Sequence, residues 1–207
     1  MCEEYVSCIA QECTKALQKL KKKKICFNGF HSSETWLLSV DGVHFPINEV
    51  RTDPSAKWYS HKFHGPGLAY EFGVALRRDA LVWMRGPFYA SIHDINIFRG
   101  GKANEKKHWD KKSLYHKLPK GRKAIGDSGY AGEPTKITIA KQQHTEEFRE
   151  FISRAKCRQE AFHSRLKFFN VLTHRFRHGV EKHRMCVEAV AVVVQYDMEN
   201  GHPLMDL

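Results

Sequence analysis

The stretch "LAYEFGVALRRDALVWMRGPF", residues 68–88, consists of two apolar runs separated by the charged segment "RRD". Apolar runs of this length around a short polar break are typical of a β-hairpin. Two upstream stretches are also typical of strands: "TWLLSVDGVHFPI" (35–47), which we expect to break at Asp41-Gly42, and the alternating "WYSHKF" (58–63). Together they predict an antiparallel three-stranded meander over residues 36–88.

Helical patterns follow the meander. The stretch "SIHDINIFR", residues 91–99, predicts a short helix that begins near Ser91 or His93-Asp94. Residues 100–123 are polar and basic, so we expect mostly loop and short helix there, followed by a strand at 123–127. Hydrophobic spacing predicts three longer helices, over residues 4–24, 145–169 and 180–200. This order of elements predicts an α/β fold with a mixed sheet.

The chain has 207 residues, enough for one well-buried domain. We expect an N-terminal helical basic segment over residues 1–35 and the α/β domain over residues 36–207. The formal net charge is +11, which favours polyanionic partners, nucleic acid first. A basic enzyme without a nucleic-acid role stays open on charge alone.

The six cysteines have no CxxC spacing, which disfavours a zinc knuckle. We expect free thiols in a reducing, intracellular compartment. No apolar run approaches the length of a membrane span, and the N-terminus carries acids where a secretory signal would carry bases. The sequence therefore predicts neither a membrane segment nor a signal peptide.

Three carboxylates interrupt apolar structure. Asp41 and Asp127 each end a predicted strand beside glycine, and "AIGDSGYAG" (124–132) fits either a tight turn or a strand end that aims Asp127 into a site. Glu160 lies roughly 140° from the centre of the apolar stripe of its predicted helix, at 100° per residue. For an isolated glutamate on a helix, a solvated face is the simpler explanation. Asp94 is either a fourth acid of the same site or a helix cap.

If these acids converge, they repel one another unless cations neutralise them. Oxygen ligands suit Mg²⁺ or Mn²⁺, and two such ions can clamp the attacking and leaving oxygens of a phosphoryl displacement. The positive charge elsewhere would then hold a DNA backbone over the acids. The residues therefore suggest a metal-dependent site for phosphodiester chemistry.

Five stretches in order resemble the successive blocks of DDE-superfamily endonuclease domains, and the nearest group is the PIF/Harbinger-like transposases. The stretches are "VDGVHFPI", "WYSHKFHGPGLAYEFGVAL", "LVWMRGPFYASIHDINIFR", "GDSGYAG" and "CRQEAFHSRLKFFNVLTHRFRH". The resemblance covers about residues 36–205, with 33 residues from Asp127 to Glu160. It implies an RNase H-like fold in which Asp41, Asp127 and Glu160 form the metal-binding triad.

The resemblance further implies that residues 36–207 form a DDE endonuclease domain, a DNA endonuclease and strand transferase of transposon origin that uses two Mg²⁺ or Mn²⁺ ions. Asp41, Asp127 and Glu160 would be catalytic and hold the metals, with Asp94 as a candidate further ligand. In a eukaryotic host the expected compartment is the nucleus. The alternative is a domesticated, catalytically idle DNA- or protein-binding module derived from a transposase.

Some features depart from the family pattern. His163 stands where the family often has Asn, and Val43 where it often has a small or threonine-like residue. Such transposases usually carry a helix-turn-helix DNA-reading segment, for which residues 1–35 are too short. We therefore expect a DNA-reading partner protein or a lost specificity module.

Several basic side chains near these acids have two interpretations. Arg158, Arg165 and Lys167 flank Glu160 and are either phosphate contacts or ordinary helix-surface cations. His44 either reaches the site or is structural. The run "LKKKK", residues 20–24, is a solvated helix end, a phosphate-binding patch or a nuclear address.

Overall fold

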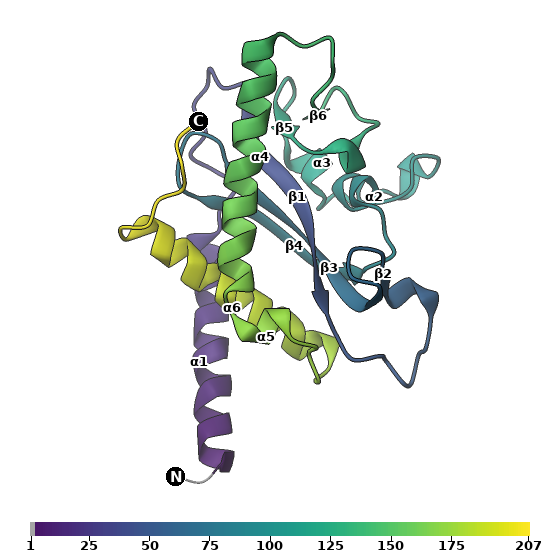
Figure 1. Cartoon of the computed structure of the whole chain (residues 1–207), viewed down its shortest axis with the longest axis vertical. Coiled ribbons are helices and arrows are strands. Elements are labelled where there is room, and N and C mark those ends of the chain that lie inside the picture. The colour runs from purple at the N-terminus through teal and green to yellow at the C-terminus, as the bar shows by residue number, and fades with distance from the viewer. Residues whose placement is uncertain (1–2) are drawn as a thin grey trace.

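The computed structural model describes residues 3–207, with side chains from Cys8 onward except that of Ile9. Its centre is a six-stranded mixed sheet in the order β2-β3-β1-β5-β6, with β4 also paired to β3. The strands are β1 (Trp36–Pro46), β2 (Tyr59–Ser60), β3 (Gly65–Ala75), β4 (Leu81–Tyr89), β5 (Lys123–Ile125) and β6 (Ile137–Thr138). The predicted α/β, RNase H-like architecture is confirmed (Figure 1).

Helices cover both faces of this sheet (Figure 1). They are α1 (Glu3–Lys24), α2 (Asp94–Arg99), α3 (Leu114–Lys117), α4 (Glu146–Lys167), α5 (Asn170–Thr173) and α6 (Val180–Glu199). Short 3-10 turns occur at Ala56–Trp58, Lys106–His108 and Ser128–Tyr130. The three longer predicted helices are thus present, within a few residues of their expected bounds.

The predicted meander is confirmed, because β3 pairs antiparallel with both β1 and β4. The hairpin between β3 and β4 closes with the amide of Ala75 donating to the carbonyl of Ala80 at 2.8 Å. The expected strand over residues 58–63 is wrong in extent: only Tyr59–Ser60 pair with β3, and the chain then turns. The alternating pattern there reflects a short edge segment rather than a full strand.

The expected break at Asp41-Gly42 is also wrong. β1 continues through both residues, with Asp41 opposite Phe72 and Gly42 opposite Glu71 on β3. The uninterrupted pairing with β3 overrides the local turn preference of the Asp-Gly pair. On its other side, β1 pairs with the parallel strand β5 only as far as Ser39. Asp41 therefore lies just beyond the point where its parallel neighbour ends.

Side chains of β1 point alternately to the two faces of the sheet, and each face has its own hydrophobic core. Val43 and Phe45 pack with Phe162 of α4 and with α6 on one face. Leu38 and Val40 pack with α2, α3 and the segment after β5 on the other. Because successive strand residues point to opposite faces, Asp41 faces α4 while Gly42 faces α2.

Two contacts stabilise the long helices, one at the start of α4 and one between α1 and α6. The hydroxyl of Thr145 caps α4 by accepting from the amide of Phe148 at 3.3 Å, as the acids after Thr145 suggested. The C-terminal half of α1 packs against α6, where Lys21 Nζ lies 2.7 Å from Glu188 Oε1. The first contact satisfies an amide at the start of α4, and the second pairs the buried carboxylate of Glu188.

Cys8, Cys13, Cys26, Cys157 and Cys186 are free thiols, and Cys2 lies outside the described residues. Among the residues that the structure describes, no helix has the length and apolar character needed to cross a membrane.

Candidate active site

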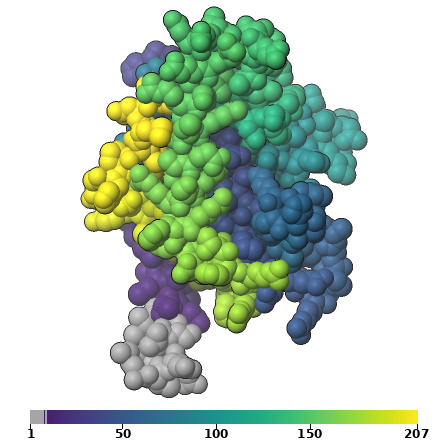
Figure 2. All heavy atoms as spheres, viewed as in Figure 1, coloured from purple at the N-terminus to yellow at the C-terminus, as the bar shows by residue number. Residues whose placement is uncertain are grey.

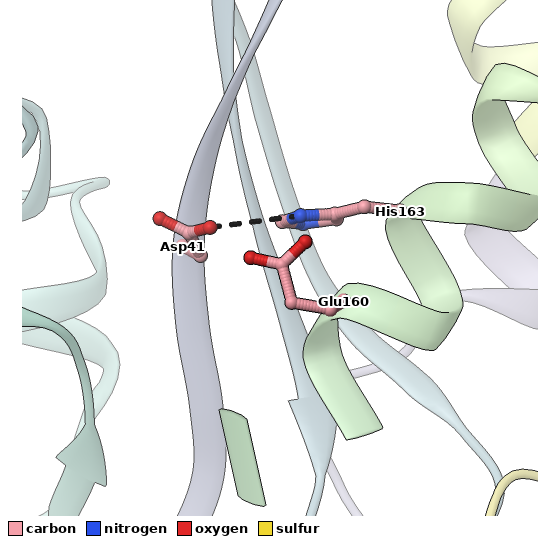
Figure 3. Close-up of side chains that lie close together, drawn as sticks. All are labelled: Asp41, Glu160 and His163. Atoms are coloured by element: carbon pink, nitrogen blue, oxygen red, sulfur yellow. Dashed lines mark ion pairs between the residues drawn. The ribbon is translucent and has the colours of Figure 1, made fainter. Parts of the chain in front are cut away.

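Asp41 and Glu160 come together in space, with His163 beside them (Figure 3). Asp41 projects from β1, whereas Glu160 and His163 project from α4, one turn apart. Each residue offers one ligand atom, and these atoms all lie within 4.8 Å of one another. Glu160 was predicted to lie away from the apolar stripe of α4. It is exposed, and the face of α4 that carries it is the face that approaches Asp41.

The hydrogen bonds of His163 define its role in this group. The side-chain amide of Gln159 donates to the carbonyl of Phe72 and also lies 3.0 Å from Nε2 of His163. Because an amide nitrogen only donates, Nε2 is the acceptor, and the ring proton lies on Nδ1. Nδ1 lies 3.6 Å from Oδ2 of Asp41. The protonated nitrogen of His163 thus faces Asp41, at a distance longer than a hydrogen bond.

Burial shifts the pKa values of Asp41 and His163 in opposite directions. It raises the pKa of Asp41 to about 6, and the neighbouring Asp127 and Asp94 act in the same direction, against Lys62 and the amide of Gly42. Burial, with the cations Lys167 and Lys62, lowers the pKa of His163 to about 3, so its ring is neutral at pH 7. The group thus holds excess negative charge that a cation would stabilise.

Asp94 approaches the same place from the other face of β1. It is the first residue of α2, whose N-cap is His93, so the helix-cap interpretation of Asp94 is wrong. A β-carbon placed on Gly42 would lie 2.2 Å from Asp94 Oδ1. Burial raises the pKa of Asp94, which Lys62 opposes and Asp127 reinforces. Gly42 is therefore needed for close approach of this carboxylate.

Asp127 follows the end of β5 and caps the turn Ser128–Tyr130, where its Oδ1 accepts from the amide of Gly129 at 2.9 Å. A β-carbon on Gly129 would lie 3.1 Å from Asp127 Oδ1 and 3.4 Å from Asp94 Oδ2. The two carboxylates therefore face the same glycine. Among the described residues, neither joins the tight group of Asp41, Glu160 and His163.

Lys62 is the site cation that sequence analysis did not single out. Its Nζ donates to the carbonyl of Gly42 at 2.6 Å and lies 3.8 Å from Asp94 Oδ2. It belongs to the turn between β2 and β3, where the pattern "WYSHKF" suggested only an alternating strand. No periodicity marks a lysine that reaches back to a neighbouring strand, so this contact depends on tertiary structure.

The other basic candidates divide into two kinds. Arg158 is 2% exposed and its Nη2 binds Asp79 Oδ1 at 2.7 Å, and Arg165 binds the carbonyl of Pro203 at 3.0 Å. These two arginines are structural. His44 Nδ1 lies 2.7 Å from the hydroxyl of Ser60, and burial lowers its pKa to about 4, so it is a neutral structural partner. Lys167 is exposed at the end of α4.

The donor set fits a hard divalent cation. Carboxylate oxygens of Asp41 and Glu160 are the ligands that Mg²⁺ and Mn²⁺ prefer, and Asp41 also feels the charges of Asp127 and Asp94. Asp94 and Asp127, on either side of Gly129, offer further oxygens nearby. His163 offers no free ring nitrogen to a metal in this hydrogen-bond pattern, because Nε2 accepts from Gln159 and Nδ1 carries the proton.

In a comparison with protein families, the family described as DDE superfamily endonuclease matches residues 40–195. The matched region contains all four acids and extends over most of the chain, from β1 into α6. No curated protein and no solved structure matches the chain.

Proposed function

The chain belongs to the DDE superfamily of endonucleases, and from this premise we propose that it is a metal-dependent DNA endonuclease and strand transferase of the PIF/Harbinger type. The observation that carries the proposal is the meeting of Asp41 and Glu160, which come from a strand and a helix 119 residues apart in the chain. The two carboxylates repel one another, and a bound cation would compensate their charge.

The proposed ligands are Asp41, Asp127 and Glu160, with Asp94 as a further oxygen donor. When bound, two Mg²⁺ or Mn²⁺ ions would activate the attacking water or 3′-hydroxyl and stabilise the leaving oxygen. The chain's own part is to position its carboxylates. Nδ1 of His163 lies 3.6 Å from Asp41, and the amides of Gly42 and Gly129 donate to Asp41 and Asp127.

Nicking of supercoiled plasmid DNA tests this proposal. We expect cleavage with Mg²⁺ or Mn²⁺ and none with EDTA. Asp127→Asn keeps the shape of the side chain but removes its charge, so we expect it to lower the rate by about a hundredfold or more, since metal-ion stabilisation is worth several kcal/mol. Asp53→Asn, in an exposed loop, is the matched control. Equal rates for both variants would contradict the proposed role of Asp127.

A further inference from the structure

A groove of about 570 Å³ extends from the acids along the C-terminal half of β1. Its lining includes the acids Asp41 and Glu160 and the cations Lys62, Lys167 and Arg175, together with His44, His163 and apolar side chains. Figure 2 shows the hollow between the green spheres of α4 and the blue spheres of the strands. The groove therefore connects the candidate metal ligands to a set of cations.

Two of these cations are free to bind a ligand. Lys167 ends α4 and Arg175 follows α5, and both are exposed. Among residues whose side chains are described, neither forms an ion pair or a side-chain hydrogen bond. By contrast, Arg158 and Arg165 on the same helix are engaged with Asp79 and Asp197. Lys167 and Arg175 are therefore uncompensated cations that line the same groove as Asp41 and Glu160.

Lys62 differs from these two because it is anchored to the carbonyl of Gly42 and lies near Asp94. It partly neutralises the acidic end of the groove, which lowers the repulsion that an approaching anion meets there. Lys167 lines the same groove as His163 and Glu160, so the free cations share its walls with the acids. An anionic chain that enters along the cations would therefore be led to the acids.

Resting on the proposed function, we propose that this groove binds the DNA strand next to the phosphodiester that is cut, with Lys167 and Arg175 contacting its phosphates. A nucleic-acid backbone fits because it presents phosphates at regular intervals, so one phosphate can lie at the acids while its neighbours meet the cations. These contacts carry no base information, so they position the strand without selecting a sequence.

Salt-dependent binding tests the groove separately from cleavage. The full chain is titrated against a short fluorescein-labelled duplex of arbitrary sequence, with Ca²⁺ replacing Mg²⁺, at several salt concentrations. The test variant is Lys167→Gln with Arg175→Gln. The matched control is Lys120→Gln with Arg77→Gln, which removes the same charge at exposed positions outside the groove. Thermal unfolding of both variants verifies that each is folded.

We expect the groove variant to reduce the slope of log K against log salt by about 0.9 for each phosphate that the protein no longer neutralises. The control should keep the wild-type slope. Equal slopes for the two variants, or no binding by the wild type, would overturn the groove proposal. Plasmid nicking separates this result from the proposed function: a wild type that binds through the groove but does not cut leaves the groove proposal standing and contradicts the nuclease.

Discussion

Gly42 has no side chain, and the carboxylate of Asp94 fills the space where one would lie. This explains a glycine in the middle of β1, where the residue is otherwise unfavourable. The glycine allows an acid on α2 to approach Asp41 through the sheet. The absence of a side chain at Gly42 therefore allows acids on the two faces of β1 to come close to one another.

We expect Gly42→Ala to destabilise the protein by about 1–3 kcal/mol, the usual cost of an overpacked site. The reason is the 2.2 Å approach of the new β-carbon to Asp94 Oδ1. In an Asp94→Ala background most of this destabilisation should disappear, because the clashing atom is gone. Urea unfolding of the four proteins measures the effect, and an equal destabilisation in both backgrounds would contradict it.

Glu71, opposite Gly42 on β3, is a fully buried acid that the proposed chemistry does not use. Trp83 donates to its Oε1 at 2.8 Å, while Oε2 has no partner in the described structure. Burial raises the pKa of Glu71 to about 8, so the carboxyl is neutral at pH 7. Glu71 therefore behaves as a buried hydrogen-bonding group rather than as a metal ligand.

Because the pKa of Glu71 is higher in the folded protein than its ordinary value of 4.5, the folded state loses stability as pH rises from 4.5 to about 8. Glu71→Gln keeps the shape and cannot ionise. We expect the variant to gain stability relative to the wild type, on the order of a few kcal/mol, as pH rises over this range. Urea unfolding at several pH values checks this, and a difference independent of pH would be evidence against a raised pKa.

At the scale of elements, α1 is fixed to the domain by two of the lysines in its last turn. Lys21 binds Glu188 and Lys24 binds Glu199, both on α6. Lys22 and Lys23 lie on the exposed side. The basic run therefore has a structural half and a solvated half.

Replacing Lys21 and Lys24 by Gln should loosen α1, because both substitutions remove an ion pair with α6. We expect faster hydrogen exchange in the C-terminal half of α1, with little change in the salt dependence of DNA binding. The matched control replaces Lys22 and Lys23 by Gln, which leaves the ion pairs with α6 intact. Equal exchange rates for the two variants would show that the ion pairs do not hold α1.

The elements with strong periodicity were predictable, and those set by distant contacts were not. The stripe and cap of α4 and the two runs of the β3–β4 hairpin predicted these elements almost in full. The turn signal at Asp41-Gly42 was misleading, because pairing with β3 along the whole of β1 outweighs it. The acids could be picked out by position, but the approach of Lys62 and His163 depends on packing across the sheet.

At the scale of the whole molecule, a chain with net charge +11 concentrates several acids around the middle of β1, just beyond the end of its pairing with β5. Repulsion among these acids weakens the protein without metal, and a bound cation should relieve it. We expect Mn²⁺ to raise the melting temperature, since a ligand that binds only the folded state stabilises it. EDTA should reverse the rise, and Glu160→Gln should reduce it. A melting temperature unaffected by Mn²⁺ in the wild type would be inconsistent with a metal site.

Plasmid nicking with Mn²⁺ tests most directly whether these carboxylates serve one metal site. The rates to compare are those of Asp41→Asn, Asp127→Asn and the double variant. Residues that act as a unit are strongly non-additive. We expect the rate of each single variant to fall by about a hundredfold or more, and the double variant to be little slower than either. Rate reductions that multiply in the double variant, or nicking by Asp127→Asn at the wild-type rate, would show that Asp127 does not share the site of Asp41.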